Sequence, residues 1–351
     1  MLDSNVASRI AAARAGDPNE FSGLTEPYRH ELQVHCYRML GSLQEAEDLV
    51  QETFLRAWRR LETYTGRASL RAWLYKIATN ACLDALEKRP RRTLPVRSQP
   101  PAEPSQPPAP PLTELIWLEP FPDDLLDDVE PTPEARYAMH ESITLAFLTA
   151  LQLLPPRQRA VLLMRDVLDW SASQVAKLLD MTIPAVNSAL HRARVTLGRN
   201  YTAERPASLR LADPATRALL DRYVETWEQA DVPGLLALLR EDVTISMPPS
   251  PTWYLGRAAL GEVARGMIFA GEARGRFRLR LVRANGQPAF GFYRRDEVEG
   301  KYRAESIQVV SLAEGETHIL ALTSFFDARL FARFGLPSEL APFAGTLPHI
   351  F

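Results

Sequence analysis

The chain has 351 residues, and its 41 Lys and Arg against 43 Asp and Glu leave a formal net charge of -2. This length exceeds one ordinary domain, so two or three domains are expected. The near-neutral charge excludes a uniformly basic nucleic-acid binder. Two cysteines, no signal peptide and no apolar run of membrane-spanning length predict a soluble, cytoplasmic protein with reduced thiols and no membrane partner.

Residues 1–89 alternate helical patterns with short breaks, which predicts a compact helical domain. One helix covers AEDLVQETFLRAWRR at 46–60, and Ser42 with Glu45 predicts a capping box at its start. Its buried stripe follows helical spacing and comprises Ala46, Leu49, Val50, Thr53, Phe54, Ala57, Trp58 and Leu61. Leu55 lies instead on the opposite, polar face with Asp48, Gln51 and Glu52. A partner helix would explain this leucine, and so would chance, since single exposed leucines are common.

The next stretch, TYTGRASLRAWLYKIATN at 63–80, interleaves aromatic and cationic residues. They are Tyr64, Trp73 and Tyr75, and Arg67, Arg71 and Lys76. Rings that stack on bases and charges that hold phosphates are what single-stranded DNA requires. Trp73 and Ile77 are better explained as core, and a solvated helix face is the alternative for each single residue. The loop 64–69 as a whole is the stronger candidate.

Residues 90–134 predict a linker. Prolines are dense, and PPAEPSQPPAPP at 100–111 favours an extended, partly polyproline conformation. The tract 88–97 is strongly basic and would attract anions. The tract 119–134 carries acids and no base, so it resembles an anion such as nucleic acid. The segment 115–121 is too apolar to remain in water without cost, so Trp117 and Phe121 are expected to form an interdomain contact.

Residues 135–201 return to helix, and WSASQVAKLLDMTIPAVNSALHRARVTL at 170–197 predicts a helix-turn-helix. Ser171 or Ser173 caps the first helix, and Thr182 caps the second, whose first turn tolerates Pro184. The core stripe of the second helix comprises Ile183, Val186, Leu190, Ala193 and Leu197. The outward side, suited to base edges and phosphates, comprises Ala185, Asn187, Ser188, His191, Arg192 and Val195, with Arg194 and Arg199 as further candidates. A helical hairpin with solvated arginines is the alternative.

These stretches, with ASLRAWLYKIATNACLDALEKRPRR at 68–92 and LPPRQRAVLLMRD at 154–166, resemble in their order a bacterial RNA polymerase sigma factor of the extracytoplasmic-function group. The resemblance covers residues 1 to about 201. It implies that the first domain binds the clamp helices of core RNA polymerase through Asp48, Gln51, Glu52 and Leu55. It also implies that this domain melts the minus-ten promoter element, and that the helix-turn-helix reads the minus-thirty-five element.

By the same resemblance, promoter DNA at the minus-ten element would be bound by Tyr64, Arg67, Ser69, Arg71, Lys76, Asn80, Arg89, Arg91 and Arg92. The outward side of the second helix-turn-helix helix would bind the minus-thirty-five element. Two features depart from the family pattern. Asn187 and Ala189 stand where such factors often carry Lys or Arg, so this domain is expected to bind its element weakly. The linker is longer and richer in proline than usual, and its acidic end could occupy the polymerase channel meant for nucleic acid.

Residues 207–351 match no minimal sigma factor. Two helices come first, the second over 235–239, and strands follow. RFRLRLVRANGQPAFGFYRRD at 276–296 turns at Asn285–Gly286, and SIQVVSLAEGETHILALTSFF at 306–326 turns near Glu314–Gly315. This order resembles the SnoaL-like polyketide-cyclase domain. The fold class is therefore multidomain, with two all-α helical sigma domains and a C-terminal α+β cone-shaped SnoaL-like domain.

Catalysis in such a cone would need a carboxylate or histidine base in an apolar pocket. Asp242 is explained as the end of a helix, Asp327 as a cap and His318 as a hairpin edge, so no catalytic residue is predicted. The histidines and cysteines lack zinc-type spacing, so no metal or cofactor is predicted either. Aromatic residues such as Trp227 could line a pocket for a small-molecule ligand, but are more often core.

A sigma factor explains both helical domains, the uneven distribution of charge and the order of the motifs. It would direct promoter-specific transcription initiation with core RNA polymerase and promoter DNA as partners, with a regulatory C-terminal domain and no enzymatic activity. The alternative is a stand-alone helix-turn-helix regulator with a ligand-sensing or enzymatic C-terminal domain. That alternative gives no function to the helix face that carries Asp48, Gln51, Glu52 and Leu55, or to the first domain.

Overall fold

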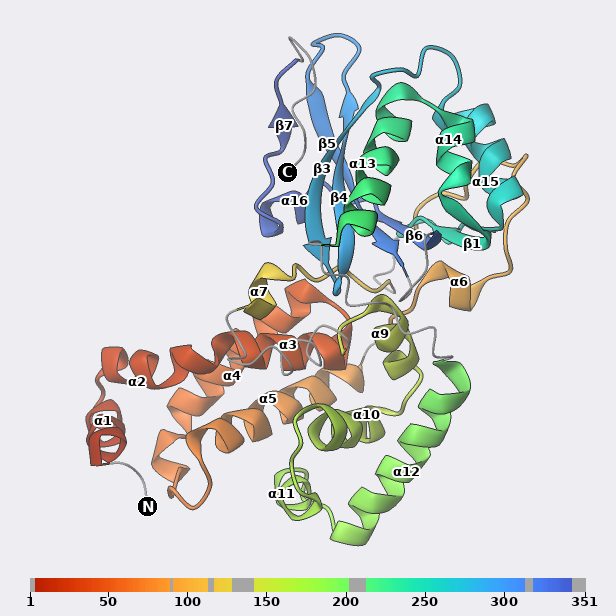
Figure 1. Ribbon diagram of the computed structural model, residues 1–351. Helices are drawn as coiled ribbons and strands as arrows, with labels where there is room; N and C mark the ends of the chain where they lie inside the picture. Colours follow the sequence, from red (N-terminus) through yellow and green to blue (C-terminus); the bar gives the residue numbers. More distant parts are fainter. Residues whose placement is uncertain are drawn as a thin grey trace. The chain divides into compact units, whose positions relative to one another are not determined.

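The computed structural model describes residues 4–88, 91–112, 117–127, 142–201, 213–312 and 318–342 (Figure 1). The chain divides into two compact units. The first comprises Met1–Arg92, Leu125–Ser142 and Ala146–Thr202, and the second comprises Thr93–Asp124, Ile143–Leu145 and Ala203–Phe351. The two predicted sigma domains therefore form one unit, and much of the predicted linker belongs to the other.

The N-terminal part of the first unit is helical, as predicted. Its helices are α1 Ser4–Arg14, α2 Pro18–Thr25, η1 Glu26–Tyr28, α3 Arg29–Leu40, α4 Leu43–Arg59, η2 Leu61–Thr63 and α5 Leu70–Leu86. Helices α3, α4 and α5 pack against one another. The Ser42 side chain accepts a hydrogen bond from the Glu45 amide at 3.2 Å, which caps α4 where the sequence predicts its start. Ala46, Val50 and Ala57 form the buried stripe of α4.

The second part of this unit contains α9 Leu145–Gln152, α10 Pro156–Leu162, the π-turn η3 Leu163–Val167, α11 Ala172–Leu178 and α12 Ile183–Asn200. Helices α11 and α12 are the predicted helix-turn-helix. Ser171 caps α11 in a full capping box with Gln174, and Thr182 caps α12. One core prediction is wrong: Ile183 is 47% exposed, because it is the first residue of α12 and precedes the buried turn that begins at Val186.

The second unit is an α+β domain with one mixed sheet (Figure 1). Its helices are α6 Pro95–Ser98, α13 Pro214–Gln229, α14 Val232–Ala237, α15 Arg257–Val263, η4 Ala264–Ile268 and α16 Leu330–Arg333, and α7 Asp124–Asp127 begins at its boundary. Its strands are β1 Leu239–Ser246, β2 Trp253–Leu255, β3 Phe277–Ala284, β4 Gln287–Arg295, β5 Tyr302–Ser311, β6 Ile319–Phe325 and β7 Glu339–Leu340.

The strand order is β2-β1-β6-β5-β4-β3, with β7 on β5; β1 pairs with β6 in parallel and the other pairs are antiparallel. The predicted turn at Asn285–Gly286 joins β3 to β4, and both residues have positive φ, 57° and 69°, as a two-residue hairpin turn requires. The other predicted turn, at Glu314–Gly315, lies outside the described residues. Asp242 lies on β1 and does not end a helix, because the second helix stops at Ala237.

The core of the second unit is built on Trp227 of α13. Its ring lies 5.2 Å from Phe269, 5.5 Å from Phe277 and 4.8 Å from Phe292, all with edge-to-face geometry. These residues are buried, so the aromatic set forms the core between the helices and the sheet. Within the described part of the chain, no helix is long and apolar enough to cross a membrane.

Candidate functional site

The outer face of α4 presents the residues that the helical pattern places away from the core. Asp48 and Gln51 are exposed, and Leu55 is 52% exposed. Glu52 is half-buried, and its Oε1 accepts a hydrogen bond from Arg56 Nε at 2.8 Å, one turn along the same helix. The four predicted residues therefore lie together on the solvent side of α4. We call them the α4 face.

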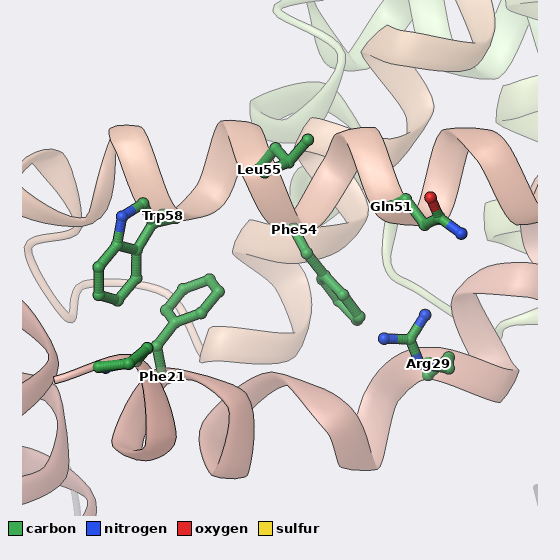
Figure 2. A pocket seen from close by; sticks show the side chains of 7 residues that line it. Phe21, Arg29, Gln51, Phe54, Leu55 and Trp58 are labelled. Carbon is green, nitrogen blue, oxygen red and sulfur yellow. The ribbon is translucent and has the colours of Figure 1, made fainter.

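An apolar groove of about 370 Å³ adjoins the α4 face (Figure 2). Its lining comes from α2, α3 and α4: Pro18, Phe21, Arg29, Gln51, Phe54, Leu55 and Trp58. Phe21 and Trp58 meet edge to face at 5.0 Å, and the Arg29 guanidinium lies 4.9 Å from the centre of the Phe54 ring. Gln51 and Leu55 thus belong both to the α4 face and to the groove. Sequence reasoning missed Pro18, Phe21 and Arg29, because they lie on other helices, and it wrongly assigned Phe54 and Trp58 to the buried stripe, although both are half-buried and line the groove.

The conformation of the loop 64–69 is fixed by the buried side chain of Tyr64. Tyr64 is 3% exposed, its hydroxyl donates to the Ala68 carbonyl oxygen at 2.8 Å, and its ring lies 5.1 Å from Trp73. Arg67 is exposed, and Ser69 caps α5 by accepting from the Ala72 amide at 3.2 Å. The structure corrects the role of Tyr64, because a buried ring offers no free face to a base. Tyr64 holds the loop that presents Arg67.

The cations of α5 already have partners. Arg71 Nε lies 2.8 Å from Glu31 Oε2, and Lys76 Nζ lies 2.9 Å from Asp180 Oδ1. Asn80 is half-buried and Arg91 is exposed. Arg92 is only 6% exposed and its Nη2 donates to Glu45 Oε1 at 2.8 Å, so this arginine fixes the end of the domain to α4 and is not free to follow DNA. Arg89 lies outside the described residues.

The exposed side of α12 carries Asn187, Ser188, His191 and Arg192, as predicted from its spacing. Ala185 is half-buried. Arg194 is exposed but forms a bidentate pair with Asp166 at 2.9 and 2.7 Å, and this pairing raises the pKa of the guanidinium. Ala189 is buried at 3%, so its lack of charge says nothing about DNA binding, contrary to our expectation. The departure from a basic recognition helix therefore rests on Asn187 alone.

The predicted interdomain residues Trp117 and Phe121 are buried in the second unit, at 7% and 0% exposure. Trp117 Nε1 donates to the Pro249 carbonyl oxygen at 2.9 Å. The Phe121 amide donates to Asn285 Oδ1 and the Phe121 carbonyl accepts from the Asn285 amide, each at 2.9 Å. These linker residues therefore contact the C-terminal domain.

The proline-rich part of the linker is bound to the same domain. Trp253 Nε1 donates to the Gln99 carbonyl oxygen at 2.7 Å, and the Ala102 amide donates to the Trp253 carbonyl at 2.8 Å. The Ala109 amide donates to Thr252 Oγ1 at 2.8 Å. We call the described residues 99–112 and 117–123 the linker strap. The strap is therefore held by its own backbone amide and carbonyl groups and by the Trp117 indole.

Acidic groups inside the C-terminal domain are paired with arginines. Glu228 Oε2 lies 2.9 Å from Arg278 Nη1, and burial nevertheless raises the pKa of Glu228. Burial likewise raises the pKa of Glu305, which pairs with Arg294 at 2.7 Å. Among the residues that the structure describes, no group of three or more His, Cys, Asp or Glu could hold a metal ion. A carboxylate that is already hydrogen-bonded to an arginine is poorly placed to act as a base.

The chain matches three domain families: Sigma-70 region 2 over 24–92, Sigma-70 region 4 over 144–197, and the SnoaL-like domain over 220–317. It is 43% identical over 347 residues to the ECF RNA polymerase sigma factor SigG of Mycobacterium tuberculosis. That alignment covers 97% of this chain and 89% of SigG. The chain belongs to the extracytoplasmic-function sigma factors. It is therefore a protein that directs transcription initiation, with a SnoaL-like domain at its C-terminal side.

Two further comparisons separate the parts of this sigma factor. The ECF RNA polymerase sigma factor SigW of Bacillus subtilis is 25% identical over 197 residues, which is 56% of this chain and 96% of SigW. The crystal structure of the Mycobacterium tuberculosis sigma factor SigJ matches 92% of this chain and 100% of its own, with a TM-score of 0.55 and 21% identity. SigW thus matches about half of this chain over nearly its own full length, whereas SigJ shares the fold over 92% of this chain.

Proposed function

We propose that this sigma factor binds core RNA polymerase through the α4 face and the adjoining groove. The observation that carries the proposal is Leu55, which is 52% exposed at the groove beside Phe21, Phe54 and Trp58. An apolar groove with a charged rim is the usual form of a protein-binding surface, because burial of the apolar centre supplies free energy and the rim supplies specificity. Asp48 and Glu52 provide acidic groups, and Arg29 provides a cation.

Promoter DNA would contact two surfaces of the first unit. At the minus-ten element we propose Arg67 of the loop and Arg71, Lys76 and Asn80 of α5, with Arg91 beyond it. Tyr64, Ser69 and Arg92 would act indirectly, since they hold the loop, cap α5 and fix the end of the domain. These cations can hold phosphates of a separated strand.

At the minus-thirty-five element we propose Asn187, Ser188, His191 and Arg192 of α12, the second helix of the helix-turn-helix. Ala185 would contribute apolar contact, and Arg194 would contact DNA only after leaving its exposed ion pair with Asp166. With a single uncommitted arginine proposed to reach the bases, this domain would rely on polymerase for much of its affinity.

The C-terminal domain would regulate this activity through the linker strap. The described linker residues 93–112 and 117–124 belong to the same unit as the domain, so they do not form a freely moving connection between the two sigma regions. The strap would therefore limit how far regions 2 and 4 can separate. A small-molecule ligand of the domain could act in this way only if it bound the strapped and released states with different affinity. We propose no catalytic role for the domain, because Glu228 and Glu305 are engaged by arginines.

Reconstituted transcription tests the proposal directly. Purified full-length protein is added to core RNA polymerase with genomic promoter fragments, and transcript start sites are mapped. The proposal predicts initiation at a defined promoter class that core polymerase alone does not use. The alternative, a stand-alone regulator, predicts promoter binding without polymerase and no new start sites, and that result would reject our proposal.

A further inference from the structure

Lys76 and the turn of the helix-turn-helix are joined in this structure. Lys76 Nζ lies 2.9 Å from Asp180 Oδ1 and 3.0 Å from Oδ2, and it donates to the Lys177 carbonyl oxygen at 3.4 Å. Lys76 is on α5 of region 2, and Asp180 is in the turn between α11 and α12 of region 4. A carboxylate therefore lies where Lys76 would otherwise hold a DNA phosphate. We call this ion pair the latch.

Aromatic contact supports the latch from one side. Tyr75, the neighbour of Lys76 on α5, meets Trp170 edge to face at 5.1 Å, and the two are 1% and 8% exposed. The Arg71 guanidinium lies 5.2 Å from the centre of the Tyr75 ring and 6.0 Å from that of Trp170. A second proposed minus-ten cation thus lies beside region 4, although its side chain remains 38% exposed.

A buried arginine joins the two regions on another side. Arg159 of α10 is 1% exposed, and its Nη1 donates to the Met39 carbonyl oxygen near the end of α3 and to Gln152 Oε1 at 2.7 Å. Its Nη2 donates to the Gln152 and Leu154 carbonyl oxygens, each at 3.2 Å, at the end of α9. A guanidinium between two helix C-termini meets the negative end of each dipole. Regions 2 and 4 therefore share contacts that are specific in geometry.

This arrangement is incompatible with simultaneous binding of both promoter elements. The minus-ten and minus-thirty-five elements are named for positions about 25 base pairs apart, which is roughly 85 Å of duplex at about 3.4 Å a step. Lys76 and Asp180 are in contact. Both regions cannot reach their elements until they part.

We propose that the first unit exists in a closed state that must open before promoter DNA is bound, and that the exposed Lys76–Asp180 latch adds to the buried Tyr75–Trp170 and Arg159 contacts that hold it. The inference rests on the proposed DNA-binding function. The latch is suited to reversible use, because both partners are partly exposed, at 37% and 76% of their side chains, and exposed ion pairs are weak and screened by salt. DNA phosphates or the polymerase surface can therefore compete with Asp180.

Pulsed electron paramagnetic resonance on the full-length chain tests the latch without DNA. Spin labels are attached at Glu62→Cys and Ser173→Cys, both at exposed positions, while the native Cys36 and Cys82 are buried. We expect one short-distance population, and a longer population that grows in Asp180→Asn and in Lys76→Gln. Asparagine tolerates the left-handed conformation of Asp180, whose φ is 52°, so only charge is lost. Asp169→Asn is the matched control, because Asp169 is exposed with the same φ of 52° and is not part of the latch.

A transcription assay supplies the second readout. Asp180→Asn should raise initiation about two- to fivefold, as expected for loss of one exposed ion pair, and Asp169→Asn should not change it. If the Asp180→Asn protein and the labelled protein that retains Asp180 give identical distance distributions, the inference is overturned, whatever the transcription assay shows. If instead the distances lengthen and no variant initiates at any promoter, the latch stands and the sigma-factor function fails.

Discussion

Trp117 and Pro249 are joined by a hydrogen bond from the indole Nε1 to the carbonyl oxygen, 2.9 Å long, across 132 positions of sequence. The indole is 7% exposed, so the bond forms in a largely dry environment. Leaving a buried carbonyl oxygen without its donor lowers the free energy of unfolding by about 1–3 kcal/mol. This bond attaches the second segment of the linker strap, residues 117–123, to the C-terminal domain.

The strap gives a first prediction. Trp117→Ala should release the segment, because it removes the hydrogen bond and about 2–3 kcal/mol of apolar burial. Hydrogen exchange of the Leu112 and Leu118 amides, which donate to Pro249 and Thr93, should accelerate about tenfold or more. Transcription should change in the same direction as in a chain truncated after Tyr201. Trp73→Ala, in the other unit, is the control and should leave strap exchange unchanged. Unaltered exchange in Trp117→Ala would show that the strap does not depend on this residue.

The α4 face gives a second prediction. Leu55→Arg should abolish association with core RNA polymerase while the thermal midpoint stays within about 1 °C, because an exposed position is changed and no core contact is lost. Polymerase pull-down and thermal unfolding measure the two effects. Leu255→Arg is the matched control, since Leu255 on β2 is 49% exposed compared with 52% for Leu55. Retention of polymerase by a folded Leu55→Arg protein would exclude this face.

The recognition helix gives a third prediction. Arg192→Ala should cost about 1–3 kcal/mol of promoter binding by the polymerase complex if the guanidinium contacts a base edge. That cost should depend on the upstream sequence, and binding titrations on a set of substituted minus-thirty-five elements measure it. An equal loss on every sequence would indicate a phosphate contact instead. Arg222→Ala, at an exposed position of α13, should bind like the unsubstituted protein, and equal behaviour of the two variants would remove Arg192 from the site.

A buried histidine gives a pH prediction. His35 is 1% exposed, its Nε2 lies 2.9 Å from Thr79 Oγ1, and burial lowers its pKa to about 3. The unfolded chain binds the proton with a pKa of about 6.5, so stability from His35 is complete above that value and is lost as the pH falls toward 3. At pH 5 the loss is about 2 kcal/mol.

Thermal unfolding measures this effect over a range of roughly pH 7.5 to 4.5, which brackets the pKa of the unfolded state at about 6.5. His35→Gln should weaken the dependence of the first unit's midpoint on pH over that range. His191→Gln, at an exposed position, should preserve the dependence of the unsubstituted chain. A His35→Gln profile parallel to the unsubstituted one would mean that other groups cause the acid sensitivity.

Local signals determined much of this protein from sequence alone. The caps Ser42, Ser171 and Thr182 begin helices where predicted, and Asn285–Gly286 forms its hairpin turn. Each such signal acts within about four residues, through a cap hydrogen bond or a permitted positive φ, so sequence spacing expresses it completely. The same holds for the α4 face, because helical period alone places Leu55 opposite Val50 and Ala57.

Tertiary structure alone decided which cations are available and what the linker contacts. Aromatic content predicted that Tyr64 binds DNA and the family resemblance implied the same of Arg92, yet Tyr64 donates a hydrogen bond within its own loop and Arg92 pairs with Glu45. The same content could not show that Lys76 meets Asp180, 104 positions away. Side-chain type and spacing set what a residue can bind, whereas its actual partner depends on long-range packing that no local period encodes, and that packing joined the strap to Pro249 and Asn285.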